Sequence, residues 1–287
     1  MTRPRISAVV GLAFLLGLGS LGADPAGFHP LASLTGLSGR LRAIFALPHE
    51  RVPGADGRER KPGIYDLARS VGSAFHLIVL TPFSAKVHGR IGEYRMGRWP
   101  HEGRSSGDSS YDTPKGFIAV TRQNAGVHVS DHFTLGQFVT KDQFETWPKY
   151  VVLDRRLLDK LELTIEELQR MGHPVHGLFV MSGFRTPQYN ERGVGAGGRA
   201  ALSRHQYGDA ADVYPDDNGR GLMDDLNGDG RVDLADARIL AEAAEHVEES
   251  HPELVGGIGV YPATSVHGPF VHIDARGRKA RWGASGE

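Results

Sequence analysis

Apolar residues recur every three or four positions between residues 153 and 168. The members of this series are Leu153, Leu157, Leu158, Leu161, Ile165 and Leu168. Charged residues fill the positions between them, so the segment has the period of an amphipathic helix with one buried face. Gly172 and Pro174 follow and predict where the helix ends. We expect this helix to cover a core and to carry no chemistry of its own.

Shorter apolar runs, bounded by turns rich in Gly, Pro and Ser, predict strands before that helix. These strands are expected at residues 76–80, 85–94, 116–121 and 126–129. We therefore predict a small β-rich module over residues 63–130. Its aromatic residues Tyr94, Trp99 and Tyr111 are expected to pack in a small core, and the alternative is that they stack on sugars or another surface.

The residues before this module divide into two segments. Residues 1–23 begin with cationic Met1–Arg5, continue with an apolar run and end with small residues, which is typical of a secretory signal peptide. We expect cleavage after Ala23; an uncleaved membrane anchor is the alternative. Residues 24–62 contain a helical pattern at 31–47 and a polar, turn-rich linker. The mature protein is accordingly expected in the periplasm or outside the cell.

The composition limits the possible partners. The chain has 287 residues, is 40% hydrophobic and balances 33 Lys and Arg against 34 Asp and Glu. Such a chain can bury an ordinary core, but it has no broad cationic field for a nucleic-acid backbone. We therefore exclude nucleic acid as a partner. The absence of cysteine also excludes disulfides and thiolate metal ligands.

The chemistry is concentrated in residues 203–212 and 271–274. The strand period of residues 270–274 places Phe270, His272 and Asp274 on one face. Asp212 lies in an apolar segment, where burial of its carboxylate is costly unless a cation neutralises it. Two imidazoles and one carboxylate form a set of three zinc ligands that leaves one coordination position open. We therefore predict a zinc site made by His205, Asp212 and His272.

The segment from Ser203 to Asp212 resembles the Ser-x-His-x-x-Gly-x-Ala-x-Asp motif of the zinc D-Ala-D-Ala peptidases, which share a superfamily with lysostaphin-type endopeptidases and the Hedgehog signalling domain. Every fixed position of the motif is present. The resemblance implies an α+β zinc peptidase domain over residues 131–287, in which a small antiparallel sheet bears the zinc ligands and helices pack on one side. It further implies an exported metallopeptidase that cleaves peptidoglycan stem peptides, as a D,D-carboxypeptidase or a cross-link endopeptidase.

One position departs from the pattern of this superfamily. Many members have a glutamate three residues before the last histidine ligand, where this chain has Pro269. Hydrolysis needs a group that takes a proton from water and returns it to the leaving amine. We expect His267 to supply this function, with Asp274 as the alternative. Asp274 is equally suited to orient an imidazole ligand.

Substrate binding is expected at the block that begins with Ser182 and contains Arg185. In related enzymes the equivalent arginine holds the carboxylate or carbonyl of the peptide, a task that suits a planar guanidinium. A surface ion pair is the alternative for Arg185. Asn190 and Ser203 are expected to support either the loop or the substrate backbone.

Residues 225–236 match the spacing of an EF-hand calcium loop. The six ligand positions are occupied by Asp225, Asn227, Asp229, Arg231, Asp233 and Asp236. Gly230 and Val232 occupy the glycine and apolar positions of such a loop, and a helix is expected to follow. An aspartate at the last position is expected to weaken calcium binding. The alternative is an acidic surface insertion without an ion.

Two other functions remain open from the sequence. The absence of the usual glutamate favours a non-catalytic zinc-containing protein that binds the cell wall. The unexplained β-rich module favours a zinc hydrolase that acts on another exported peptide.

Overall fold

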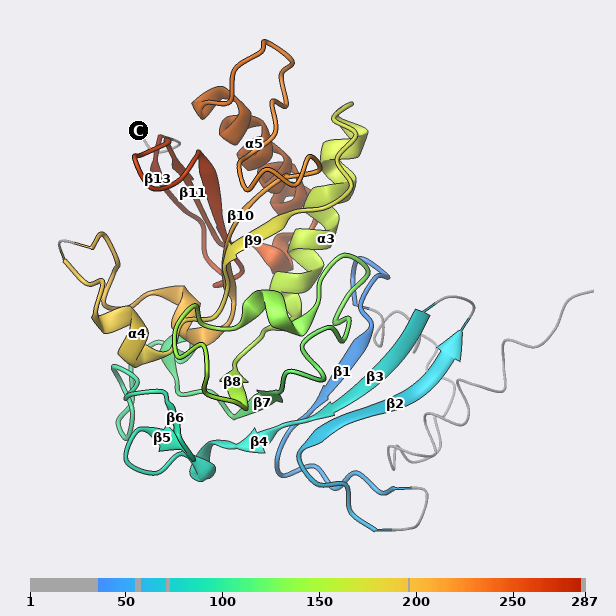
Figure 1. The fold of residues 1–287 in the computed structure, drawn as a ribbon, viewed down its shortest axis with the longest axis vertical. Coiled ribbons are helices and arrows are strands. Elements are labelled where there is room, and N and C mark those ends of the chain that lie inside the picture. The colour runs from blue at the N-terminus through green and yellow to red at the C-terminus, as the bar shows by residue number, and fades with distance from the viewer. Residues whose placement is uncertain (1–35, 55–57, 71–72, 196, 285–287) are drawn as a thin grey trace, which may run out of the picture.

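The computed structural model describes residues 36–54, 58–70, 73–195 and 197–284. A five-stranded sheet and two long helices form the C-terminal part, and three smaller sheets lie before them in the chain (Figure 1). The described residues include no helix that is long and apolar enough to cross a membrane. The predicted signal peptide or anchor at residues 1–23 lies outside the described residues.

Strands β1 (Ala43–Ala46), β2 (Gly63–Ser70) and β3 (Ser73–Val79) form the first sheet, in the order β1-β3-β2. The helix predicted at 31–47 is wrong in its described part, because residues 43–46 pair with β3 instead. Ile44 and Phe45 lie opposite Leu77 and Ile78, so cross-strand pairing outweighs a weak helical period. Strand β2 was not predicted from the sequence.

The middle of the chain forms two further small sheets. Strands β4 (Thr81–Pro82), β7 (Gly116–Val120) and β8 (Lys149–Val151) make one, and β5 (Arg90–Ile91) and β6 (Tyr94–Arg95) make a short hairpin. The single strand predicted at 85–94 is wrong, because Gly89 and Gly92 adopt positive φ and turn the chain. Residues 126–129 likewise form turns and bridges, not a regular strand.

The largest sheet has the strand order β13-β11-β12-β10-β9. Its strands are β9 (Phe179–Ser182), β10 (Ala210–Tyr214), β11 (Gly257–Tyr261), β12 (Phe270–Asp274) and β13 (Ala280–Gly283). The predicted antiparallel arrangement holds for four of the strands. Strand β13 differs, because the chain passes from β12 to the far side of β11 and pairs with it in parallel.

Two long helices lie side by side against this sheet (Figure 1). Helix α3 (Arg155–Arg170) begins at Asp154, whose side chain accepts a hydrogen bond from the amide of Arg156. Its apolar series is buried, which confirms the predicted amphipathic helix. Helix α5 (Leu234–Ser250) packs on β11 and β12 and also contacts α3, so both helices cover the same face. The short helix α4 (Pro187–Glu191) lies outside this layer.

A single cluster of buried apolar side chains extends through both parts of the chain. It contains Leu41 from the segment before the predicted β-rich module, Trp99 and Phe117 from that module, and Leu157, Val213 and Ile273 from the predicted peptidase domain. Tyr94 and Trp99 are both 1% exposed, which confirms that these two aromatic residues pack in a core. The module therefore supports the large sheet through shared apolar packing.

Candidate metal centre

Two of the three predicted ligands lie next to each other on the central strands of the large sheet. Asp212 on β10 is paired with His272 on β12 in the antiparallel register. Paired residues of adjacent strands point to the same face, so the carboxylate and the imidazole project together. Both strands are buried along their whole length, which keeps water away from most of this face.

His205 reaches the same point from a one-turn 3₁₀ helix at Arg204–Tyr207. The helix ends at Gly208, whose φ of 75° is left-handed. A Cβ atom at position 208 would also lie 2.3 Å from the carbonyl oxygen of Val152. Glycine is therefore required at position 208 for two reasons. The turn needs a positive φ, and the turn packs directly on the backbone of Val152, before α3.

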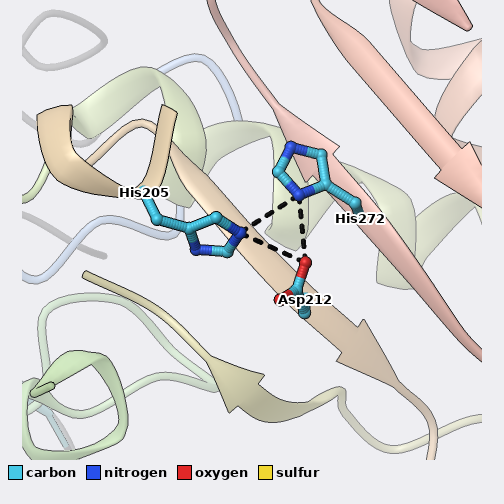
Figure 2. Close-up of side chains that lie close together, drawn as sticks. All are labelled: His205, Asp212 and His272. Atoms are coloured by element: carbon cyan, nitrogen blue, oxygen red, sulfur yellow. Dashed lines mark hydrogen bonds and ion pairs between the residues drawn. The ribbon is translucent and has the colours of Figure 1, made fainter. Parts of the chain in front are cut away.

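The three ligand atoms form a nearly equilateral triangle (Figure 2). Nε2 of His205 lies 3.1 Å from Nδ1 of His272 and 3.2 Å from Oδ1 of Asp212, and the third side measures 3.0 Å. All three residues are buried. Within the described residues this is the one group of three or more His, Asp and Glu side chains that meets the spacing of a metal site.

Outer hydrogen bonds determine which nitrogen of each imidazole faces the triangle as an acceptor. Nδ1 of His205 lies 2.7 Å from the carbonyl oxygen of Gly183, which only accepts, so that nitrogen carries the proton. Nε2 of His272 lies 3.1 Å from Oδ2 of Asp274 and donates to it in the same way. Neutral imidazoles held like this direct lone pairs at each other and at Asp212 Oδ1, an arrangement that a cation stabilises.

The size of the triangle suits a small transition-metal ion. Zinc bonds to nitrogen and oxygen of about 2.0–2.2 Å place neighbouring atoms of a tetrahedral site about 3.3–3.5 Å apart. The observed separations of 3.0–3.2 Å are slightly shorter. A buried His205–Asp212–His272 group of this geometry can bind a metal ion. His205, Asp212 and His272 would be its ligands, and one position of a tetrahedron would remain for water or substrate.

Burial and neighbouring charges shift the pKa values of the three residues of the triangle in different ways. Burial lowers the pKa of His205 to about 4. Burial opposes protonation of His272 too, but hydrogen bonds to Asp212 and Asp274 outweigh it and raise the pKa of that residue. Burial alone would raise the pKa of Asp212, whereas His205 and Arg185 hold it well below its usual value. A metal ion would bind to the same three acceptor atoms in competition with protons.

Arg185 lies on the far side of the Asp212 carboxylate. Its Nη2 binds Asp212 Oδ2, the oxygen that does not face the triangle, and its Nε donates to Ser182 Oγ at 2.8 Å. The guanidinium thus fixes Asp212 so that one oxygen points at the histidines. Substrate binding by Arg185 stays a prediction, and among the described residues Nη1 makes no hydrogen bond that would prevent it.

Asp274 is fully buried behind His272. Besides Nε2 of His272, its carboxylate accepts hydrogen bonds from the amide of Gly257 at 2.8 Å and from the guanidinium of Arg276. Burial would raise its pKa, but His272 and Arg276 hold the pKa far below the usual value. This geometry favours the alternative role from the sequence analysis, in which Asp274 orients the imidazole ligand.

His267 lies on the loop before β12. Its Nδ1 is 2.8 Å from the carbonyl oxygen of Gly268, so this nitrogen donates and Nε2 keeps its lone pair. The ring packs edge-on against Phe270, with 5.0 Å between ring centres. Phe270 shares the ligand face with His272, since the two are separated by two positions on β12. His267 therefore lies at the edge of this face and is not part of the triangle.

Asn190 and Ser203 lie in the polypeptide framework around the site. Asn190 donates to the carbonyl oxygen of Ala200 at 2.9 Å and is buried, which ties α4 to the loop that leads to His205. Ser203 precedes the 3₁₀ helix, and its carbonyl accepts from the amide of Gln206 at 3.1 Å. These contacts favour loop support, and a role in substrate binding stays a prediction for both residues.

The predicted calcium loop directs its side-chain oxygens at its own backbone. Asp225 accepts from the amides of Gly228, Asp229 and Gly230, and buried Asp236 accepts from those of Leu226, Asn227 and Asp233. Among the described residues, its carboxylates do not form a group with the spacing of a metal site. Calcium binding by this loop stays a prediction.

Two aromatic residues beside the triangle were missed by the sequence analysis. Trp282 on β13 contacts the ring of His272, with 5.0 Å between ring centres, and its Nε1 donates to the hydroxyl of Tyr261 at 2.7 Å. The signal for Trp282 is the pair Gly257 and Gly259, which lie two positions apart on one face of a strand. Two glycines so placed indicate that another group packs closely against the strand.

Comparison with models of protein families, with curated proteins and with solved structures gives no match.

Proposed function

We propose that this protein is an exported zinc metallopeptidase that hydrolyses bonds in peptidoglycan stem peptides, as a D,D-carboxypeptidase or a cross-link endopeptidase. The observation that carries the proposal is the convergence of three acceptor atoms, from His205, Asp212 and His272, in a buried triangle of about the size of a zinc site. The substrate class comes from the resemblance of residues 203–212 to zinc D-Ala-D-Ala peptidases, and export comes from the character of residues 1–23.

In this mechanism each residue has a separate task. A zinc ion in the triangle would polarise the scissile carbonyl and make a water molecule more acidic. His267 takes a proton at Nε2 from the attacking water and later returns it to the leaving amine, a task that suits an imidazole near neutral pH. Arg185 binds the peptide through Nη1 while its other nitrogens hold Asp212 and Ser182. Asp274 keeps the ring of His272 in place.

A second candidate function is a zinc-containing protein that binds the cell wall without cleaving it. The observation that favours it is the shortage of general bases: Pro269 replaces the usual glutamate, and Asp274 is fully engaged by Arg276, His272 and Gly257. In this case His267 only packs against Phe270 at the edge of the ligand face and takes no part in proton transfer.

Digestion of purified muropeptides separates the two candidates. We expect the zinc-loaded protein to release cleaved peptides, detected by chromatography and mass spectrometry, and a zinc chelator to stop the reaction. His205→Ala should be inactive and lack zinc, whereas His176→Ala should behave as wild type, because the side chain of His176 is 88% exposed and distant in the chain from the motif. Binding of muropeptides without cleavage would favour the second candidate.

A calcium ion at residues 225–236 is a separate proposal that rests on the spacing of the oxygen-bearing residues. Its role would be to stiffen the loop before α5. If calcium binds there, a calcium chelator lowers the melting temperature of the wild type and leaves that of Asp225→Ala unchanged. Equal melting temperatures with and without chelator would contradict it.

A further inference from the structure

A row of residues crosses the large sheet at the level of the metal ligands. Trp282 is paired with Gly259, Gly259 with His272, His272 with Asp212, and Asp212 with Ser182. Side chains in such a row share one face. Because Gly259 has no side chain, the indole of Trp282 occupies the space beside His272.

The indole lies almost on the backbone of β11. A Cβ atom at position 259 would be 2.4 Å from Nε1 of Trp282, and one at 257 would be 2.7 Å from the far end of the same ring. Trp282 therefore extends along Gly257 and Gly259 with its N–H above Gly259, next to the imidazole of His272.

The phenol of Tyr261 is held at this N–H. Tyr261 lies two positions after Gly259 on the same face of β11, and its hydroxyl oxygen accepts the hydrogen bond from Trp282 Nε1 at 2.7 Å. Its ring stacks on Phe270, its partner across the strands, with 4.6 Å between ring centres and an angle of 7°. The hydroxyl is thus directed back along the strand toward the row that contains His272 and Asp212.

The hydrogen-bond roles at this phenol leave its own proton available. The indole N–H can only donate, so the Tyr261 oxygen acts as the acceptor in that bond. Burial raises the pKa of Tyr261 although the hydrogen bond from Trp282 opposes this shift; a phenol whose ordinary pKa is about 10 is therefore protonated at neutral pH. A protonated phenol at the edge of a metal-ligand face is a hydrogen-bond donor for a ligand of that site.

We propose that the Tyr261 hydroxyl donates a hydrogen bond to the carbonyl oxygen of the scissile peptide bond as negative charge develops on it, and that Trp282 is the positioning residue that orients the phenol. This inference rests on the proposed peptidase function. No proton is transferred in this step, since the phenol stabilises charge and His267 carries the proton.

The test compares zinc-loaded wild type with Tyr261→Phe, and uses Tyr65→Phe as the matched control, because the Tyr65 hydroxyl donates to the carbonyl of Lys61 in an exposed hydrogen bond. Zinc content should be equal in all three. Acetohydroxamate, whose carbonyl oxygen stands in for the scissile carbonyl, should bind Tyr261→Phe at least about tenfold more weakly in calorimetry. On muropeptides, kcat should fall about a hundredfold while KM changes little, because the bond strengthens in the transition state.

Trp282→Phe provides a second variant that keeps an aromatic ring on this face and removes the N–H together with part of the indole. It should weaken acetohydroxamate binding in the same direction but by less, with unchanged zinc content. Equal acetohydroxamate affinity in wild type and Tyr261→Phe, or no binding to the wild type, would overturn the inference. Failure of the wild type to cleave any muropeptide would instead refute the proposed function, while acetohydroxamate affinity would still test the phenol.

Discussion

The carboxylate of Asp274 combines full burial with a very low pKa, which is an unusual pair of properties for an acid. Burial alone disfavours the charged form, yet His272, Arg276 and the amide of Gly257 all donate to it. A carboxylate that already accepts several hydrogen bonds is a poor proton acceptor, and it holds the imidazole of His272 in a fixed orientation. It sets the tautomer of His272 and therefore the direction of the lone pair on Nδ1.

We predict that Asp274→Asn weakens zinc binding about 10- to 100-fold without preventing it, because the amide oxygen still accepts from His272 but carries no charge. Competition with a chromogenic zinc chelator measures the effect. Asp66→Asn is the control, because that carboxylate is 66% exposed and binds His76 in another sheet. Unchanged zinc affinity in Asp274→Asn would refute the anchoring role.

The pair of His132 and Glu162 adds a pH-dependent contribution to stability. Their side chains are 2.6 Å apart, and Glu162 has no exposed surface. The hydrogen bond to Glu162 raises the pKa of His132 in spite of partial burial. A pKa that is higher in the folded state stabilises the fold fully below the unfolded value of about 6.5, and this contribution disappears as the pH rises through the folded value.

His132→Gln should therefore lower the free energy of unfolding by about 1 kcal/mol at about pH 5.5 and by clearly less at about pH 9. Urea denaturation at the two pH values measures the difference. His49→Gln, at an exposed position, should show neither effect. A loss for His132→Gln that is the same at both pH values would be inconsistent with this linkage.

The sequence predicted that His205, Asp212 and His272 come together, because their chemistry and order are distinctive. His205 and Asp212 belong to one contiguous motif, and the strand period placed His272 and Asp274 on one face. Tyr261 and Trp282 escaped prediction because their contact with the site depends on the register of β13 against β11. A parallel edge strand that crosses to the far side of its neighbour leaves no local period in the sequence.

Helix α5 shows how a loop that looks like an ion site can be ordered by its own hydrogen bonds. Asp233 and Asp236 form a reciprocal cap at its first turn. Asp236 is fully buried and also accepts from the amides of Leu226 and Asn227 at 2.8 and 3.2 Å. One carboxylate thus joins the start of the loop to the start of the helix.

Asp236→Ala should lower the free energy of unfolding by about 2–3 kcal/mol, because three backbone amides lose their acceptor. Asp229→Ala, in the exposed part of the same loop, should cost under about 1 kcal/mol. Chemical denaturation of both variants in calcium-free buffer measures these losses. Equal losses of unfolding free energy in the two variants would contradict the role of Asp236 as acceptor for these three amides.

Elements whose apolar residues follow a clear pattern in the sequence were predicted well. Elements that depend on pairing with a distant strand were not. Helix α3 follows from apolar spacing over 16 residues, and strand β9 follows from a short apolar run that ends at a turn. The state of strand β1 depends instead on its pairing with β3, which lies about thirty residues later. Tertiary pairing of this kind overrides a weak local preference.

The shared apolar core links the N-terminal strands to the metal-ligand motif. The indole of Trp99 packs against Phe83 and Phe117, and its Nε1 donates to the carbonyl of Gln206, next to His205. The guanidinium of Arg204 lies over the rings of Tyr111 and Tyr207, 4.8 Å from each ring centre. Residues 99–111 therefore support the turn that carries His205.

We predict a single cooperative unfolding transition, because the buried cluster is continuous from Leu41 to Ile273. Far-UV circular dichroism, tryptophan fluorescence and release of bound zinc should have coincident midpoints. Trp99→Phe should move that one transition to lower denaturant concentration and not split it. Two separate midpoints would show that the β-rich segment unfolds independently of the ligand-bearing sheet.

Titration of the metal-free protein with zinc in a calorimeter tests the metal site most directly. The account predicts that wild type binds one zinc ion per chain and that Asp212→Ala, which removes one corner of the triangle and the partner of Arg185, binds none at the same concentrations. A wild type that takes up no zinc, or an Asp212→Ala variant that binds it as tightly as wild type, would contradict the account.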